Sequence, residues 1–157
     1  MAQPPIIIRH PRRQELPALA RLFRAAVAQH FSYFPASYQR QIVRENNLRR
    51  LLQASFDNRR AVYVAVRHRQ LVGYIIAGQG NGEGHVYWLF VSPDARGEDL
   101  GARLLECALD QLRRQGTTVV VLNTHDHEGY YLGQGFVSDK TWDFNGVPVT
   151  HMRRGLG

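Results

Sequence analysis

The stretch SPDARGEDLGARLL, residues 92–105, combines glycines, arginines and acids at a point where a helix is predicted to begin. The first N–H groups of a helix have no partner inside the helix, and the helix dipole is positive there, so a helix start can bind an anion. Gly97 and Gly101 would leave the backbone open to a phosphate, and Arg96 and Arg103 would add charge-assisted hydrogen bonds. These residue types predict a site for a phosphorylated ligand.

Two acids in the same stretch, Glu98 and Asp99, oppose an anion. Asp99 is predicted to be the helix N-cap, with its carboxylate accepting hydrogen bonds from the N–H groups of Gly101 or Ala102. A phosphate would use the same donors, and the carboxylate would repel it by roughly 1 kcal/mol at 4 Å in water. The alternative interpretation is a structural turn followed by a capped helix, with no ligand.

Other reactive side chains carry a weaker signal. His125-x-His127 has the spacing of a metal-ligand pair, but the sequence offers no evident third ligand, so no metal site is predicted. Cys107 lies within a helical pattern beside its apolar stripe, and we expect an unreactive thiol in an apolar environment rather than a nucleophile.

The elements that would position these residues follow from the spacing of apolar side chains. Short runs rich in β-branched and aromatic residues predict strands over 6–10, 61–66, 71–77, 85–91, 117–123, 136–144 and 147–154. Apolar residues at helical spacing predict a helix from Gln14, a second helix capped by Ser37, and a third that begins near Leu100. A short helix is predicted over 126–134.

Turn residues connect these elements. Residues 67–70 join two strands as a hairpin, and Asn145-Gly146 predicts a type I′ turn in the closing hairpin. The glycine-rich stretch 78–84 predicts a permissive and mobile connector. The resulting order, β-α-α-β-β-β-α-β-α-β-β, predicts one mixed α/β domain over residues 1–157.

Composition limits the classes of function. The formal charge of +7 is carried almost wholly by arginines scattered from Arg9 to Arg154, which disfavours a nucleic-acid groove because such grooves gather their charge on one element. No window has the ~18 uncharged apolar residues of a membrane span. The N-terminus has no basic segment before its short apolar run, and one cysteine suits a reducing compartment, so a cytoplasmic location is predicted.

The order of strand 85–91, stretch 92–105, strand 117–123 and a short helix ending in YLGQGF resembles the GNAT acyltransferase superfamily. That family has an Arg/Gln-x-x-Gly-x-Gly/Ala loop whose backbone amides hold the pyrophosphate of coenzyme A. Arg96, Gly97, Leu100 and Gly101 match the wider family form of this loop, and the VSP before it is typical. Asp99 departs from the pattern, because the family places its middle glycine there.

The resemblance implies acetyl-CoA as cosubstrate and a GNAT acyl-CoA N-acyltransferase fold. The implied cofactor residues are Leu89, Phe90, Val91, Arg96, Gly97, Glu98, Asp99, Leu100, Gly101, Ala102, Arg103, Asn123 and Thr124. Backbone N–H groups near Phe90 and Val91 would hold the thioester carbonyl and stabilise the tetrahedral oxyanion. Asn123 or Thr124 would contact the pantetheine arm. The spacing of eight residues from Asn123 to Tyr131 does not decide between the two.

Two side chains are candidates for proton transfer. Tyr131 stands in the pattern Tyr-x-x-x-Gly-Phe, whose tyrosine in the family protonates the coenzyme A thiolate; packing is the alternative role. Regular alternation would place Glu83, His85, Tyr87, Leu89 and Val91 on one face of the strand, and His85 resembles a catalytic histidine of some relatives. A structural histidine is the alternative. Trp88 stands where many relatives carry an acid.

In the family the acceptor site forms between the first helix pair and the last hairpin. The candidates for acceptor contact are Phe31, Tyr33, Phe34, Tyr38, Tyr87, Trp142 and Phe144, with Glu83 among the acids that could bind a cationic acceptor. Ordinary core packing of these aromatic side chains is the alternative.

The first functional hypothesis is an acetyl-CoA-dependent N-acetyltransferase that moves an acetyl group directly to a primary amine of a small molecule or peptide. The alternative is a non-catalytic GNAT-fold domain that binds acyl-CoA or regulates a partner, motivated by Asp99 and by Trp88. A third hypothesis, that the protein binds nucleic acid through its basic surface, is supported by its net charge alone. The sequence is also compatible with a homodimer.

Overall fold

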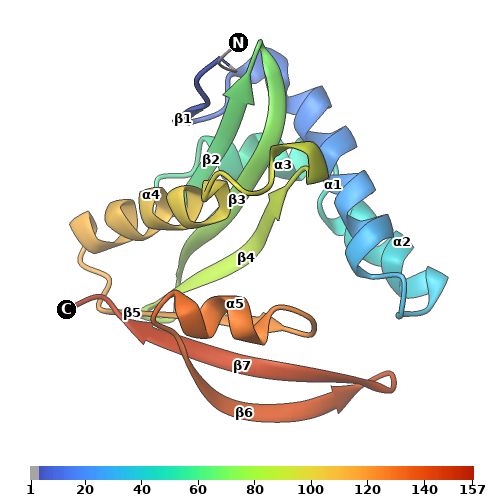
Figure 1. The fold of residues 1–157 in the computed structure, drawn as a ribbon, viewed down its shortest axis with the longest axis vertical. Coiled ribbons are helices and arrows are strands. Elements are labelled where there is room, and N and C mark those ends of the chain that lie inside the picture. Colours follow the sequence, from blue (N-terminus) through green and yellow to red (C-terminus); the bar gives the residue numbers. More distant parts are fainter. Residues whose placement is uncertain (1–3) are drawn as a thin grey trace.

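The computed structural model describes residues 4–157 and contains one seven-stranded mixed sheet in the order β1-β2-β3-β4-β5-β7-β6 (Figure 1). The strands are β1 Ile7–Arg9, β2 Arg60–Arg67, β3 Gln70–Gly80, β4 Glu83–Val91, β5 Val119–Thr124, β6 Val137–Phe144 and β7 Val147–Gly155. β4 and β5 run parallel, and the other neighbouring strands pair antiparallel. The predicted mixed α/β class is confirmed, and so is the element order, except that one predicted helix consists of two.

Helices cover both faces of the sheet. They are α1 Leu16–His30, α2 Ala36–Glu45, α3 Leu48–Ser55, α4 Leu100–Arg114 and α5 Glu128–Gly133, with single 3₁₀ turns at Arg13–Glu15 and Pro93–Ala95. The apolar faces of α1, α2 and α3 form one buried cluster with the sheet, and the apolar face of α4 forms the other.

Strand β2 illustrates how the two clusters are filled. Ala61, Tyr63 and Ala65 pack in the cluster of α4, whereas Val62 and Val64 pack in the cluster of α1. Successive side chains of a strand point to opposite faces, so a strand covered on both faces must be apolar throughout.

The predicted second helix is wrong in one respect, because it consists of two helices. α2 ends at Glu45, where the Asn46 side chain donates to the carbonyl of Ile42 at 2.9 Å. Asn47 then caps α3, its Oδ1 accepting from the N–H of Arg50 at 3.1 Å. Ser37 lies inside α2 and is not its cap.

The predicted connector over 78–84 is a tight hairpin. Gly80 ends β3, Glu83 begins β4, and the two residues between them, Asn81 and Gly82, have φ of 54° and 80°. Positive φ at both central positions fits the right-handed twist of the paired strands. The predicted turn at Asn145-Gly146 has the same form, with φ of 53° and 81°, and is confirmed.

A β-bulge interrupts β4. Its register with β3 passes from Ile76↔Trp88 to Ala77↔Val86, so Tyr87 is an extra residue. As a result Val86 and Leu89 both pack toward α4, while Trp88 packs toward α1. The predicted common face of Glu83, His85, Tyr87, Leu89 and Val91 is therefore wrong, since regular alternation stops at the bulge.

No helix of the described residues is long and apolar enough to cross a membrane. The sequence predicts no signal peptide at the N-terminus. Residues 1–3 of that segment lie outside the described residues.

Candidate active site

The parallel strands β4 and β5 pair only over a short distance. The ladder joins Gly84 to Val120 and His85 to Val121, and beyond His85 the two strands are no longer paired. A cavity of about 480 Å³ lies beside this unpaired part of β4, closed by α1 on one side and by the start of α4 on another. Unpaired backbone groups at a strand edge can bind a ligand that enters the gap.

The cavity is lined by residues from five parts of the fold. They are Ala26, Val27 and His30 of α1 and Phe31 directly after it; Tyr74 and Tyr87–Val91 of the sheet; Arg96, Gly97 and Asp99–Ala102 before and in α4; Asn123–His127 at and after the end of β5; and Tyr130 and Tyr131 of α5. Eleven of the thirteen predicted cofactor residues are among them, and Glu98 and Arg103 are not.

The turn before α4 contains two residues with left-handed backbone. Gly97 has φ of 91°, and a side chain built there would meet nothing within 4 Å, so its backbone faces open space. Asp99 has φ of 55°, a conformation that aspartate adopts more readily than most residues with a side chain. The glycine that the family has at this place meets the same backbone requirement.

Asp99 occupies the N-cap position of α4, but its side chain makes no capping hydrogen bond. The predicted capping contact to Gly101 or Ala102 is therefore wrong. A capping residue normally has an extended backbone that points its side chain at the first N–H groups of the helix, and a left-handed backbone does not. Those N–H groups are thus not occupied by the Asp99 carboxylate.

The other acid of the loop, Glu98, forms an ion pair with Arg67 at the end of β2. This contact neutralises its charge. Arg103 also points away from the cavity, since its guanidinium donates to the carbonyl of Ile6 at 3.3 Å. Arg96 does line the cavity, where its Nε donates to the carbonyl of Val91 at 3.2 Å. One arginine and one aspartate therefore set the charge at this end.

Gly101 is in close contact with α5. A Cβ atom at this position would lie 2.7 Å from the hydroxyl oxygen of Tyr130, so glycine is needed for the present position of that side chain. Burial and the negative charge of Asp99 raise the pKa of Tyr130. The Tyr130 hydroxyl is thus a protonated hydrogen-bond donor beside the loop.

Tyr131 lines the cavity and packs edge-on against Phe136, with ring centroids 5.6 Å apart. Burial raises the pKa of its phenol above the ordinary value of 10.0, and the neighbouring Tyr130 and Asp126 act in the same direction. The phenol is therefore protonated at neutral pH and can donate a proton to an atom in the cavity.

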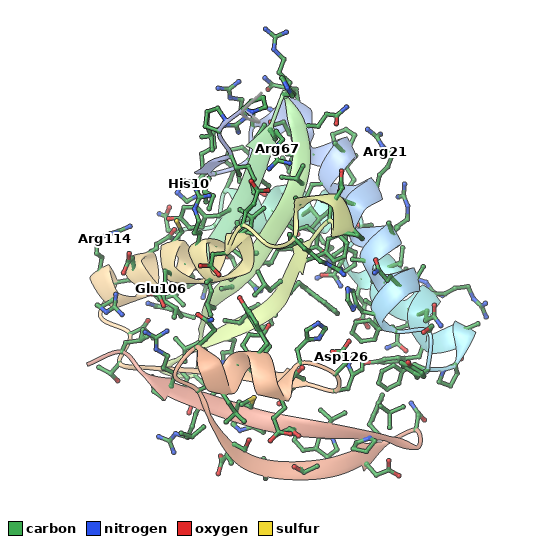
Figure 2. All side chains as sticks on the ribbon, in the orientation of Figure 1. His10, Arg21, Arg67, Glu106, Arg114 and Asp126 are labelled. Carbon is green, nitrogen blue, oxygen red and sulfur yellow. The ribbon has the colours of Figure 1, made fainter. Side chains whose placement is uncertain are left out.

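A cluster of histidines around Asp126 also lines the cavity. Its Oδ1 lies 2.6 Å from Nδ1 of His127, and its Oδ2 lies 3.4 Å from Nδ1 of His30, the last residue of α1. Burial opposes ionisation of Asp126, but the hydrogen bond and the charges of the histidines lower its pKa overall. Figure 2 labels Asp126 beside the end of α5 that faces α1 and α2.

This cluster was missed from the sequence as a site. The spacing His125-x-His127 was its one visible signal. His30 lies 95 residues before His125, and only the packing of the end of α1 against the end of β5 brings it close, with Nε2 of His125 2.6 Å from the carbonyl oxygen of His30.

The predicted acceptor residues divide into two groups. Phe31 and Tyr87 line the cavity, and the buried Phe34 packs beside it against His125, Tyr38 and Phe144, with centroids 5.1 to 5.9 Å apart. The aromatic contact between the first helix pair and the last hairpin therefore exists.

The other predicted residues lie outside the cavity. Tyr33 is 76% exposed, Trp142 is on the edge strand β6, and neither lines the cavity. Glu83 and His85 precede the bulge at the paired end of β4, and the structure places both away from the cavity. The His85 ring stacks on Tyr87 instead, with centroids 5.7 Å apart.

In a comparison with protein families, residues 26–156 match the Acetyltransferase (GNAT) domain. The chain belongs to the GNAT acetyltransferase family. The predicted membership is thus confirmed, and acetyl-CoA is the acetyl donor that enzymes of this family use. Comparison with curated protein sequences gives no match.

Solved GNAT structures share the fold at low sequence identity. The PaiA N-acetyltransferase of Thermoplasma acidophilum, in complex with coenzyme A, has a TM-score of 0.80 and 19% identity, over 96% of this chain and 99% of its own. Aminoglycoside 6′-acetyltransferase type Ii has a TM-score of 0.75 and 19% identity, over 96% and 97%. The Escherichia coli ribosomal-protein-S18-alanine N-acetyltransferase has a TM-score of 0.70 and 16% identity, over 98% of this chain and 95% of its own.

Proposed function

We propose that this GNAT protein transfers an acetyl group from acetyl-CoA directly to a primary amine of a small molecule or peptide. One observation carries the proposal. The cavity at the unpaired end of β4 brings together an open loop before α4, a strand edge with unpaired backbone groups, and the phenol of Tyr131.

The pyrophosphate of coenzyme A would bind at the start of α4. The N–H groups there carry no capping side chain, the dipole of a 15-residue helix favours an anion, and Arg96 adds a positive charge. The Glu98 carboxylate is held by Arg67, which leaves Asp99 as the one acid of this loop that faces the cavity.

The pantetheine arm and the thioester would follow the edge of β4 from Val91 towards the bulge. Backbone N–H groups of this segment are not used by the β4–β5 ladder, so they are able to hold the thioester carbonyl. The same donors would stabilise the negative charge that develops on this oxygen in the tetrahedral intermediate.

In the reaction, the amine nitrogen attacks the thioester carbon, the C–S bond breaks, and the coenzyme A thiolate takes a proton from Tyr131. The amine nitrogen loses one proton to water, and the Tyr131 phenolate regains its proton from water. The phenol is protonated at neutral pH, because burial raises its pKa, and so it has a proton to give in this step. His85 lies outside the cavity, so the proposed mechanism gives it no part in proton transfer.

The acceptor would enter on the side of Phe31, where aromatic side chains of the turn after α1, of α2 and of β6 meet. An aromatic wall favours an amine with an apolar body. The solved neighbours act on different acceptors by their names, so both small amines and peptide α-amines belong in a screen.

Titration calorimetry with acetyl-CoA, followed by a screen of primary amines, tests the proposal. We expect micromolar binding and acetylation of at least one amine. Tyr131→Phe should lower turnover by about 10²- to 10⁴-fold, because it removes a positioned acid, while the dissociation constant of acetyl-CoA changes less than about twofold.

His85→Ala is the matched control, because this side chain lies on β4 but outside the cavity. It should keep full turnover at and below neutral pH, and a loss there would restore the predicted base. No heat with millimolar acetyl-CoA and no turnover would refute the proposed function and favour a non-catalytic domain. Unchanged turnover in Tyr131→Phe would refute the role of the phenol alone.

A further inference from the structure

Three donor groups converge on one wall of the cavity from two distant parts of the chain. His30 ends α1, and Asp126 and His127 follow β5. One ligand atom of each residue lies within 4.8 Å of the ligand atoms of the other two. The carboxylate lies between the imidazoles, 2.6 Å from Nδ1 of His127 and 3.4 Å from Nδ1 of His30.

We propose that His30, Asp126 and His127 bind one divalent transition-metal ion, with zinc as the reference ion. Two imidazole nitrogens and one carboxylate oxygen are a donor set that zinc and non-haem iron use in proteins. Magnesium and calcium prefer oxygen ligands alone, so this set selects against them. This inference goes beyond the proposed function, because binding of the ion requires neither acetyl-CoA nor an amine.

The spacing of the donors suits such an ion. Zinc ligands lie about 2.0–2.2 Å from the metal, so neighbouring ligands of a tetrahedral site are roughly 3.3–3.6 Å apart. The contacts of 2.6 Å to His127 and 3.4 Å to His30 use different carboxylate oxygens of Asp126, and one ligand atom of each residue lies within 4.8 Å of the other two. Rotation of the imidazole rings and of the Asp126 carboxylate would bring one donor atom of each residue to one ion.

Contacts that do not use the ligand atoms hold the two segments in place. Nε2 of His125 contacts the carbonyl oxygen of His30 at 2.6 Å and ties the end of α1 to the loop after β5. The N–H of His127 donates to Oγ1 of Thr124 at 3.1 Å, and the His30 ring packs edge-on against Phe90. The site is therefore largely formed before an ion binds.

The three side chains are also accessible to an ion. His30, Asp126 and His127 are 24%, 29% and 47% exposed, and all three line the cavity. Three protein ligands leave the fourth position of a tetrahedral ion open, as in zinc sites that bind a further molecule. Here that position faces the cavity, where water or a nitrogen or oxygen atom of an entering molecule completes the coordination.

The test is a titration of the metal-free protein with Zn²⁺ against a chromophoric zinc indicator, without acetyl-CoA. We expect one Zn²⁺ per chain, no competition by Mg²⁺, and Co²⁺ absorption bands typical of nitrogen and oxygen ligands. Asp126→Asn and His127→Ala should each weaken Zn²⁺ binding at least about tenfold. Zinc should raise the melting temperature of the original protein, because it binds the folded state, and should not raise that of His127→Ala.

His151→Ala is the matched control. His151 lies 3.3 Å from Asp139 and so forms a similar histidine–carboxylate pair, but within the described residues this pair belongs to no group of three donors. The control should bind Zn²⁺ as the original protein does. Binding weaker than millimolar, or equal losses in His151→Ala and His127→Ala, would overturn the proposal. His127→Ala changes an exposed loop residue, so its folding can be checked without metal by circular dichroism.

Discussion

At residue 99 the backbone conformation and the side-chain charge have opposite consequences for an anion. The turn requires φ of 55°, which aspartate accepts, and this conformation keeps the carboxylate off the first N–H groups of α4. The charge itself remains at the cavity, whereas the charge of Glu98 is paired with Arg67. Asp99 should therefore weaken the binding of coenzyme A without preventing it.

Asp99→Asn isolates this charge effect, since asparagine also tolerates a left-handed backbone. Removing one negative charge near a phosphate is worth about 1 kcal/mol in water, so the dissociation constant of acetyl-CoA should fall about fivefold. Titration calorimetry at low salt measures it. Asp94→Asn removes an exposed acid from the same loop, outside the cavity, and should change the constant less than twofold. Unchanged or weaker binding in Asp99→Asn would contradict the argument.

At the scale of elements, α1 is positioned by a contact at its beginning. Arg9 of β1 donates two hydrogen bonds to Glu15, at 2.8 and 2.9 Å, and the N–H of Arg12 donates to the same carboxylate at 2.7 Å. The hydrogen bonds from Arg9 lower the pKa of Glu15. This contact fixes the end of the sheet to the helix whose other end carries His30.

Glu15→Gln should lower the free energy of unfolding by about 1 to 2 kcal/mol at pH 7, because it breaks a charge-assisted bidentate pair. A carboxyl with a lowered folded pKa stabilises the protein above its unfolded pKa, near 4.5, and loses this effect as the pH falls through the folded pKa. Urea unfolding at several pH values should therefore show the difference between the two proteins shrinking below about pH 4.5.

The exposed pair Arg113–Asp110 provides the comparison for this variant. Asp110→Asn should change the free energy of unfolding by less than about 0.5 kcal/mol at every pH, as exposed ion pairs contribute little. A difference for Glu15→Gln that stays constant down to pH 3 would show that the carboxylate charge is not the cause.

At the scale of the whole molecule, the cavity joins two parts of the fold that have few shared hydrogen bonds. α1, β4 and the start of α4 form one side, and the end of β5 with α5 forms the other. The strands between them pair at only two positions. A ligand that fills this gap contacts both parts and should stabilise the folded state as a unit.

Coenzyme A at about 100 times its dissociation constant should add about 2.7 kcal/mol to the free energy of unfolding. For a chain of this length that corresponds to a rise of roughly 5–10 °C in melting temperature, measurable by calorimetry. Gly101→Ala should show a smaller rise at the same concentration, because the added methyl group meets the Tyr130 hydroxyl at the loop. No rise with coenzyme A would argue against binding in the cavity.

Apolar periodicity and turn residues predicted the mixed sheet and the loop before α4, because these patterns act over a few neighbouring positions. The resemblance to the GNAT family indicated eleven of the cavity residues, which lie on consecutive stretches of chain. The tertiary structure decided the rest. The bulge at Tyr87 moved His85 out of the cavity, the left-handed backbone turned Asp99 away from the helix start, and helix packing brought His30 to Asp126. These outcomes depend on contacts between residues far apart in the chain, which local patterns do not encode.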